Sequence, residues 1–314
     1  MLLVPAAPPK SFGGRETVEC TELEPALTST HSGSERPMAY KLLALDVDGT
    51  LVRRDGTIHE DDQRAIQRLK ATGVPVTIAT GRLYSGTRHV ARSIGVTGPL
   101  ACVDGSHIVD AEGSKHHHVR TLSGAAASTL KRVVSRHQPA CFLFAEDAIV
   151  YDAVGEPFAP YVKTWSPSLQ CVERVSSHPS WEHEAGVMAL VAVGSEAQIR
   201  DAEAEIRAEL DERAFVASFP VSRAQSTYGM VVRAAGSTKG TAVTWMAAYY
   251  GCSVDEVVVV GDWINDVPMF QTAGRSFAMM QAPEPVKRAA TDTLGAHGDL
   301  GGGVAEAIRR AFDV

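Results

Sequence analysis

Residues 42–50 constrain the fold of this chain more than any other stretch. They read Leu-Leu-Ala-Leu-Asp-Val-Asp-Gly-Thr, an apolar run followed by two carboxylates, Asp46 and Asp48, one residue apart. Such a run is typical of a strand that is covered on both faces, as in a parallel sheet. Gly49 and Thr50 supply the turn that ends it. Both carboxylates can therefore face a cleft at the carboxyl end of the strand, where ligands bind in open α/β sheets.

Two carboxylates this close together are costly to keep ionised unless a cation lies between them. A hard divalent cation that prefers oxygen ligands, most simply Mg²⁺, removes that cost. The alternative is an acidic turn that follows a core strand and binds nothing. Taken alone, the stretch leaves both interpretations open.

Two further apolar runs end in polar residues. Residues 74–79 run into Thr80, Gly81 and Arg82, where a hydroxyl and a backbone amide can hold a phosphate oxygen, although this tripeptide is more often an ordinary turn. Residues 256–260 run into Gly-Asp-Trp-Ile-Asn-Asp, again with carboxylates at the strand end.

Lys239 begins a predicted helix. A cation there is unfavourable for the helix dipole unless an anion binds nearby. For a single lysine, a solvated surface charge is the more common explanation. The other segments decide between these two readings.

Together, the four segments resemble the motifs of the haloacid dehalogenase superfamily of phosphohydrolases, in the same order. They are Asp-x-Asp-Gly-Thr, Thr-Gly-Arg, Ser-Thr-Lys-Gly and Gly-Asp-x-x-Asn-Asp-x-x-Met. The last of them, Gly261 to Met269, looks like the Cof-type branch, also called subfamily IIB. The resemblance covers roughly residues 40–312, and the pair formed by the first and last motifs is highly specific.

The resemblance implies a role for each motif residue. Asp46 would be the nucleophile that forms an aspartyl-phosphate. Asp48 would be the general acid and base, which protonates the leaving alkoxide and then deprotonates the attacking water. The expected Mg²⁺ ligands are Asp46, Asp48 (through its backbone oxygen) and Asp262, and the expected phosphate-binding residues are Val47 (through its amide), Thr80, Gly81, Lys239 and Asn265. Asp266 would orient Lys239 or a metal-bound water.

The implied fold is α/β, with a Rossmann-like, doubly wound parallel sheet as the core and an inserted α+β cap of type C2B. Alternating strands and helices over residues 39–120 and 233–314 themselves predict a parallel sheet. Residues 121–232 break that alternation and are predicted as the cap, which would close over the phosphate and exclude water. Hinges are expected near 119–121 and 232–236.

Residues 1–38 differ from the rest. They are rich in Pro, Ser, Thr, Gly and Glu without periodicity, which predicts a disordered N-terminal extension. The apolar start is too short for a signal peptide, and Met38 is a candidate for the true start of the protein.

The composition limits which kinds of partner the protein is expected to bind. A formal net charge of −7 without a basic run argues against nucleic acid or anionic membranes. No apolar stretch approaches the ~20 residues of a membrane span. Five cysteines without metal-binding spacing predict reduced thiols and a cytoplasmic location. We expect a monomer or a weak homodimer.

The chain departs from the Cof-type pattern in three places. Asp104-Gly105 stands where Asn-Gly-Ala is usual, Gln281 lies in Met-Met-Gln-Ala where Gly-Asn-Ala is usual, and Trp263 replaces a small or polar residue. Asp104 either adds negative charge near the pocket, disfavouring a highly anionic leaving group, or is a solvent-facing turn residue.

His116-His117-His118 suggests a metal site. Adjacent residues of an extended segment point to opposite faces, so these side chains cannot easily share one ion. We therefore predict a solvated hairpin end.

These observations predict a Mg²⁺-dependent phosphomonoesterase that acts on a small phosphorylated metabolite, either a sugar phosphate or a cofactor phosphate. Two alternatives stay open. One is a phosphotransferase similar to phosphomannomutase, which would return the phosphoryl group to a bound sugar. The other is a non-catalytic protein that senses a phosphometabolite.

Overall fold

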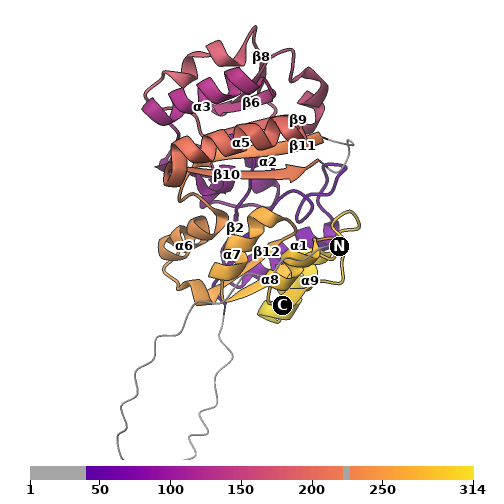
Figure 1. Ribbon diagram of the computed structural model, residues 1–314. Helices are drawn as coiled ribbons and strands as arrows, with labels where there is room; N and C mark the ends of the chain where they lie inside the picture. Colours follow the sequence, from indigo (N-terminus) through magenta and orange to yellow (C-terminus); the bar gives the residue numbers. More distant parts are fainter. Residues whose placement is uncertain (1–39, 222–226) are drawn as a thin grey trace, which may run out of the picture. The chain divides into compact units, whose positions relative to one another are not determined.

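The structure is a computed structural model, which describes residues 40–221 and 227–314 (Figure 1). These residues belong to one compact unit that spans residues 38–314. The predicted disordered extension, residues 1–38, and the candidate start Met38 lie outside the described residues. None of the helices in the described part of the chain has the length and hydrophobicity that a membrane crossing requires.

A five-stranded parallel sheet forms the core, as predicted. Its strands, in spatial order, are β14 (Asp292–Thr293), β13 (Arg275–Ala278), β12 (Val257–Gly261), β1 (Leu42–Leu45) and β2 (Val76–Ile78). Strand β1 lies between β12 and β2 and is fully buried, and its last residue, Leu45, pairs with Val260 of β12 and Ile78 of β2. The carboxyl ends of these three strands therefore lie side by side.

Helices cover both faces of this sheet. They are α1 (Glu60–Ala71), α2 (Tyr84–Ser93), α6 (Lys239–Tyr249), α7 (Val267–Thr272), α8 (Glu284–Ala289) and α9 (Gly303–Phe312). Leu43 and Leu45 belong to the apolar cluster that includes residues of α1 and α9. Leu42 and Ala44 belong to the cluster that includes residues of α6 and α7. Because side chains alternate along a strand, β1 supplies both layers of the doubly wound fold.

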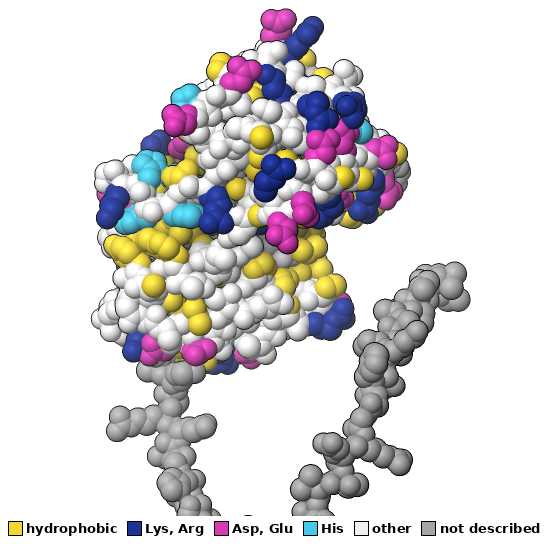
Figure 2. All heavy atoms as spheres, turned by 60° about the vertical axis from the view of Figure 1, so that its left-hand side comes forward, with side chains coloured by type: hydrophobic (Ala, Val, Ile, Leu, Met, Phe, Trp, Pro, Cys, Tyr) yellow, Lys and Arg dark blue, Asp and Glu magenta, His cyan; other side chains and the backbone are white. Residues whose placement is uncertain are grey.

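The segment between the two halves of the core forms the inserted cap. Its sheet has the order β10 (Ala214–Pro220), β11 (Thr227–Ala234), β9 (Ala189–Ser195), β6 (Ala140–Ala145), β7 (Ala148–Tyr151) and β8 (Leu169–Cys171). All pairs are antiparallel except β7 with β8. Helices α3 (Gly124–His137) and α5 (Glu196–Leu210) pack on one face of it (Figure 1). Charged side chains of both signs are interspersed on the surface of this part (Figure 2).

A third sheet connects the core to the cap. It contains β3 (Pro99–Cys102), β4 (His107–Asp110) and β5 (His116–Val119), and Ala101 of β3 forms a parallel bridge to Ala79 beyond β2. The three consecutive histidines lie in β5.

The predicted solvated hairpin end at these histidines is only partly right. The ring of His116 stacks on His107, with Nδ1 and Nε2 2.7 Å apart. The ring of His117 contacts Trp245 and Tyr249 of α6. The histidines therefore point to different neighbours, which agrees with the argument that they do not share one ion.

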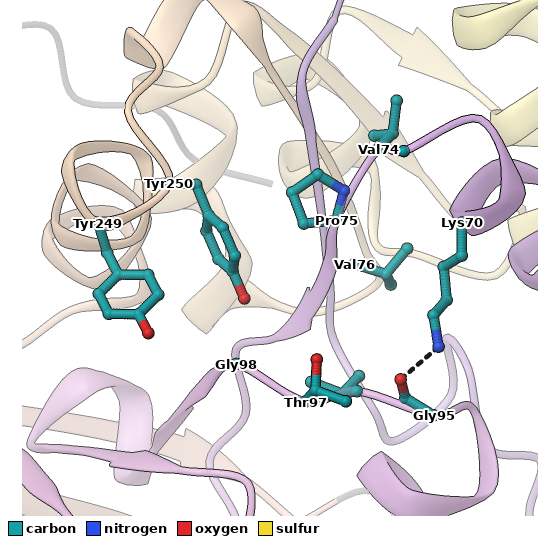
Figure 3. A pocket seen from close by; sticks show the side chains of 11 residues that line it. Lys70, Val74, Pro75, Val76, Gly95, Thr97, Gly98, Tyr249 and Tyr250 are labelled. Carbon is teal, nitrogen blue, oxygen red and sulfur yellow. Dashed lines mark hydrogen bonds between the residues drawn. The ribbon is translucent and has the colours of Figure 1, made fainter.

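A cavity of about 330 Å³ lies near the amino end of β2 (Figure 3). It is lined by Lys70, residues 73–76, residues 95–98, Tyr249 and Tyr250. Parallel strands end at the opposite edge of the sheet, and none of the predicted site residues lines this cavity. It is therefore not the predicted phosphate site.

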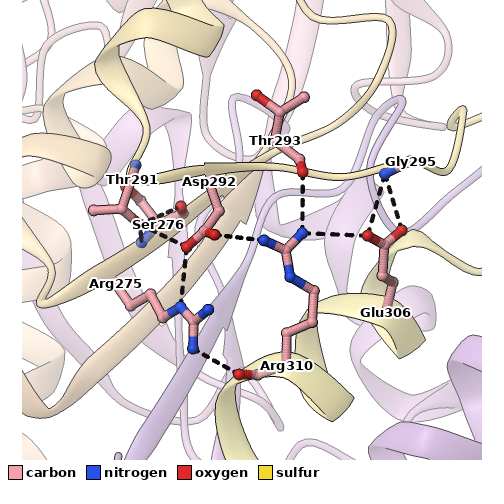
Figure 4. A network of polar contacts seen from close by, with 8 residues as sticks. All are labelled: Arg275, Ser276, Thr291, Asp292, Thr293, Gly295, Glu306 and Arg310. Carbon is pink, nitrogen blue, oxygen red and sulfur yellow. Dashed lines mark hydrogen bonds and ion pairs between the residues drawn. The ribbon is translucent and has the colours of Figure 1, made fainter.

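A polar network fixes the edge strand β14 to the C-terminal helix α9 (Figure 4). Asp292 of β14 accepts a hydrogen bond from Arg275 Nε at 3.0 Å and also pairs with Arg310 of α9. Arg310 Nη1 donates to the carbonyl oxygen of Thr293 at 3.0 Å. The helix thus covers polar groups of an edge that would otherwise be open to pairing with another chain.

Candidate active site

Three predicted motifs meet at the carboxyl edge of the core sheet. Asp46 directly follows β1, and its amide donates to the carbonyl oxygen of Val260 at 3.0 Å. Thr80 lies just beyond β2, where its amide donates to Ala101 at 2.9 Å. Asp262 directly follows β12. The buried apolar strands therefore deliver these polar side chains to one place, as ligand sites in open α/β sheets require.

Lys239 is the first residue of α6 and only 1% exposed. Its Nζ lies 2.5 Å from Asp46 Oδ1 and 2.6 Å from Asp266 Oδ1. Burial by itself lowers the pKa of Lys239, but the charges of Asp266 and Asp46 outweigh it and raise this pKa above its usual value. The alternative of a solvated surface lysine is wrong, and the ammonium stays charged between the two carboxylates.

Asp266 is fully buried and organises the loop after β12. Its Oδ2 accepts hydrogen bonds from the amides of Asp262 at 2.8 Å and Trp263 at 2.9 Å, while its Oδ1 contacts Lys239. With both oxygens occupied, Asp266 lies where the predicted role of orienting Lys239 requires it.

The residues present fit a divalent cation. Carboxylate oxygens of Asp46, Asp262 and Asp266 lie within 4.8 Å of one another. Burial, followed by the charge of Asp266, raises the pKa of Asp262 to about 7. Burial also raises the pKa of Asp46, and neighbouring carboxylates add to this although Lys239 opposes it. Oδ1 of Asp262 is buried without a hydrogen-bond partner. A hard cation would satisfy that oxygen and keep both carboxylates ionised.

Asp48 is held by a residue to which the sequence analysis gave no role. Arg82 Nε donates to Asp48 Oδ2 at 2.8 Å, and Arg82 Nη2 donates to Asp48 Oδ1 at 2.5 Å. Such bidentate pairs fix the direction of a carboxylate. The side chain of Asp48 is nonetheless 46% exposed, whereas that of Arg82 is buried. The only sequence signal was the position of Arg82 directly after Thr80-Gly81.

Asn265 lies beside Asp104, whose solvent-facing alternative is wrong. Asp104 is buried, and its Oδ1 accepts a hydrogen bond from Asn265 Nδ2 at 2.8 Å. A Cβ on Gly81 would lie 3.5 Å from Asp104 Oδ1 and 3.8 Å from Asn265 Nδ2. Gly81 and Asn265, two of the predicted phosphate-binding residues, are thus neighbours. Val47 lies between the two motif carboxylates in the sequence, and its side chain is buried in the apolar cluster that contains Leu43 and Leu45.

Apolar side chains surround this polar centre. Trp263, Ile264 and Met280 lie on the loops after β12 and β13 and are about half exposed. Gln281, the other departure from the family pattern, donates from Nε2 to the carbonyl oxygen of Gly49 at 2.7 Å and to Asp262 Oδ2 at 3.2 Å. It therefore holds the second oxygen of the predicted metal ligand.

Comparisons with known proteins agree on one family. A family model described as haloacid dehalogenase-like hydrolase matches residues 43–308. Pyridoxal phosphate phosphatase YbhA of Escherichia coli is 24% identical over 274 residues, which cover 82% of this chain and 94% of that protein. The 5-amino-6-(5-phospho-D-ribitylamino)uracil phosphatase YitU of Bacillus subtilis is 26% identical over 283 residues, which cover 87% and 98%. A solved subclass IIB sugar phosphatase superposes with a TM-score of 0.69 at 20% identity, over 86% of this chain and 98% of that one.

Proposed function

The chain belongs to the haloacid dehalogenase-like hydrolases, and from this premise we propose that it hydrolyses small phosphate monoesters with Mg²⁺ through an aspartyl-phosphate. One observation carries the proposal. The buried ammonium of Lys239 lies between Asp46 and Asp266, next to a buried oxygen of Asp262 that has no partner. The predicted nucleophile, Asp46, therefore belongs to the predicted metal site and also contacts the predicted phosphate-binding group Lys239.

The chemistry requires charge to be neutralised, because phosphoryl oxygens repel an anionic nucleophile. Around the site, five carboxylates face three cations, which leaves an excess of two negative charges: Asp46, Asp48, Asp104, Asp262 and Asp266 against Arg82, Arg233 and Lys239. Asp46, Asp262 and the backbone oxygen of Asp48 would hold Mg²⁺. When bound, its two positive charges would balance this excess, and as a Lewis acid it would polarise the phosphoryl group.

Each protein group then has one task. Thr80, the Gly81 amide and Asn265 hold the phosphoryl oxygens together with Lys239 and the Val47 amide. Asp48 first takes up a proton from solvent; an Asp46 oxygen then attacks phosphorus, the bond from phosphorus to the ester oxygen breaks, and Asp48 gives that proton to the departing alkoxide. Asp48 next takes a proton from water, whose oxygen attacks phosphorus and releases phosphate and the free Asp46 carboxylate.

We further propose a cofactor phosphate, rather than a plain sugar phosphate, as the substrate class. The two curated relatives act on pyridoxal phosphate and on a phosphorylated ribitylaminouracil, both of which carry a heterocyclic ring. The half-exposed side chains of Trp263, Ile264 and Met280 offer apolar surface near the site for such a ring. Stacking on an aromatic side chain favours flat rings over sugars.

The predicted location and partners accompany this proposal. Four cysteines of the described residues are free thiols, and Cys102 and Cys141 are buried. Free thiols support the cytoplasmic location predicted from the sequence. A small phosphorylated metabolite is the only partner that the chemistry of the site requires.

Phosphate release from a panel of sugar phosphates, cofactor phosphates and an aryl phosphate tests the proposal, with and without Mg²⁺. We expect turnover that needs Mg²⁺, is lost in Asp46→Asn, and is fastest with a cofactor phosphate. Asp201→Asn, on the exposed surface of α5, is the matched control and keeps full activity. Phosphate binding without release would favour a sensor, and transfer to a bound sugar a phosphotransferase; either result overturns the proposal.

A further inference from the structure

Asp104 has an unusual backbone and a well-defined environment. Its φ is +50°, in the left-handed region, which glycine adopts freely and which Asn and Asp adopt more readily than other residues do. Its side chain is nonetheless buried and has two polar partners: Oδ1 accepts from Asn265, and Oδ2 lies 3.2 Å from Nη1 of Arg233. Strained, buried and paired residues of this kind are retained where the surroundings over-determine them.

Arg233 comes from the cap. It lies in β11, the strand that leads back into the core, and is 3% exposed. Besides Asp104, it contacts the carbonyl oxygen of Ser237 through Nε at 3.0 Å and the ring of Phe215, 4.0 Å from its guanidinium carbon. A buried ion pair therefore joins the return strand of the cap to the side chain that contacts Asn265.

We propose that Asp104 is a positioning residue for Asn265, and that Arg233 makes this role possible by compensating its charge. The inference rests on the proposed function, because it takes Asn265 as a phosphate-binding group. A carboxylate only accepts hydrogen bonds. It therefore fixes the Asn265 amide with Nδ2 toward Asp104 and leaves the second N–H of Nδ2 for a phosphoryl oxygen.

Arg233 is needed because Asp104 lies beside two of the predicted phosphate-binding residues. An unpaired carboxylate next to Gly81 and Asn265 would repel the phosphoryl dianion. The usual Asn of Cof-type members at this position can accept from Asn265 through its amide oxygen without adding charge. Asp104 therefore needs Arg233 as its counter-charge, whereas a neutral amide at position 104 would need no counter-charge.

Calorimetric titration of inorganic phosphate into the full-length protein with Mg²⁺ tests the roles of Asp104 and Arg233 without relying on turnover. Arg233→Met leaves Asp104 uncompensated, and we expect phosphate affinity to fall about tenfold. The double variant Asp104→Asn with Arg233→Met should regain affinity to within about threefold of the original protein. Arg200→Met, an exposed arginine of α5, is the control and leaves affinity unchanged.

The variant Asn265→Ala tests whether Asp104 affects phosphate binding through Asn265. If Asp104 acts through Asn265, Asp104→Ala in the Asn265→Ala background weakens binding less than about twofold further. An equal loss from Asp104→Ala in both backgrounds would overturn the positioning of Asn265 by Asp104. A double variant no better than Arg233→Met would overturn charge compensation by Arg233, which then acts by supporting the Ser237 turn.

Two further outcomes are decisive. If Arg233→Met does not fold, Asp104→Ala gives the test from the other side: it should lower phosphate affinity, whereas Asp104→Asn keeps it, and equal affinities would contradict the proposal. Failure of the proposed function has a different signature. An original protein that binds phosphate but never turns over an ester leaves the positioning role in place, and one that binds no phosphate overturns both.

Discussion

The core and the cap each contain a cation that bridges two carboxylates, and the two bridges differ most in their exposure to water. In the core, Lys239 contacts Asp46 and Asp266, and its side chain is 0% exposed. In the cap, Arg132 of α3 contacts Glu205 and Glu209 of α5, and its side chain is 43% exposed. Water screens the second bridge and is excluded from the first.

This contrast separates function from stability. Taking charges out of water costs several kcal/mol per ion, and the mutual attraction of a buried pair recovers that cost only with good geometry. Exposed pairs cost little and contribute roughly 0–1 kcal/mol. The core bridge therefore costs desolvation free energy that the exposed cap bridge does not. This pattern is expected of a site that is retained for its chemistry.

Lys239→Met should break the contrast most strongly. It leaves Asp46 and Asp266 buried without a counter-charge, so we expect a loss of about 3–5 kcal/mol in the free energy of unfolding. Loss of a charged phosphate-binding group should also lower kcat by ~10²-fold or more. Urea unfolding and phosphate release measure the two effects. A fully active, equally stable variant would show that the bridge has no function.

Asp48→Asn should lower activity by ~10²–10⁴-fold, the usual contribution of a general acid–base. Stability should also fall, because the buried guanidinium of Arg82 loses its counter-charge, but by less than in Lys239→Met, since the Asp48 side chain is 46% exposed. The loss should be larger for an alkyl phosphate than for an aryl phosphate, whose weakly basic phenolate leaves without a proton. Kinetics with both esters test this; equal losses would contradict the assignment of Asp48 as the acid.

The contrast between buried and exposed charged groups also applies to the histidines, and it predicts how stability depends on pH. Burial, and then the charges of His116 and His118, lower the pKa of His107 from 6.5 to about 4. Because the unfolded chain binds the proton first, the native state loses stability as the pH falls from about 6.5 to about 4, by up to about 3 kcal/mol.

Unfolding at pH 7.5 and pH 5 tests this prediction. His107→Gln should make the stability less sensitive to acid than it is in the original protein. His183→Gln, in an exposed loop, is the control and should leave the pH dependence unchanged. Identical pH profiles for all three proteins would show that His107 does not titrate differently on folding.

Arg132→Met should have the smallest effect. Removing an exposed cation from the cap bridge should change the free energy of unfolding by less than about 1 kcal/mol, and less still at high salt. Phosphate release should be unchanged. Thermal unfolding at low and high ionic strength measures the difference, and a loss as large as that of Lys239→Met would remove the distinction between the two bridges.

The sequence predicted what depends on local patterns. Apolar runs that end in carboxylates indicated the parallel strands and placed Asp46 and Asp262 at one edge of the sheet, as the structure has them. Strands β4 and β5 were not predicted, because histidines and short length hide their alternation.

Contacts between distant residues were beyond the reach of those patterns. Nothing near Arg233 indicates that it pairs with Asp104, and nothing near Gln281 indicates that it holds Asp262. Such pairs form only when the fold brings separate segments together, and a single sequence carries no local signature of them. The departures from the family pattern marked Asp104 and Gln281 as positions of interest but could not supply their partners.

The pairing of β1 with β12 has a consequence for synthesis of the protein. Leu42 pairs with Val257, so β1 waits for one of its two neighbours, which is made roughly 200 residues later, about 10–40 s at ~5–20 residues per second. During that interval β1 has an open edge and apolar faces while the cap is being translated. The nascent chain is then most exposed to aggregation, and chaperones that hold apolar strands would act in this window.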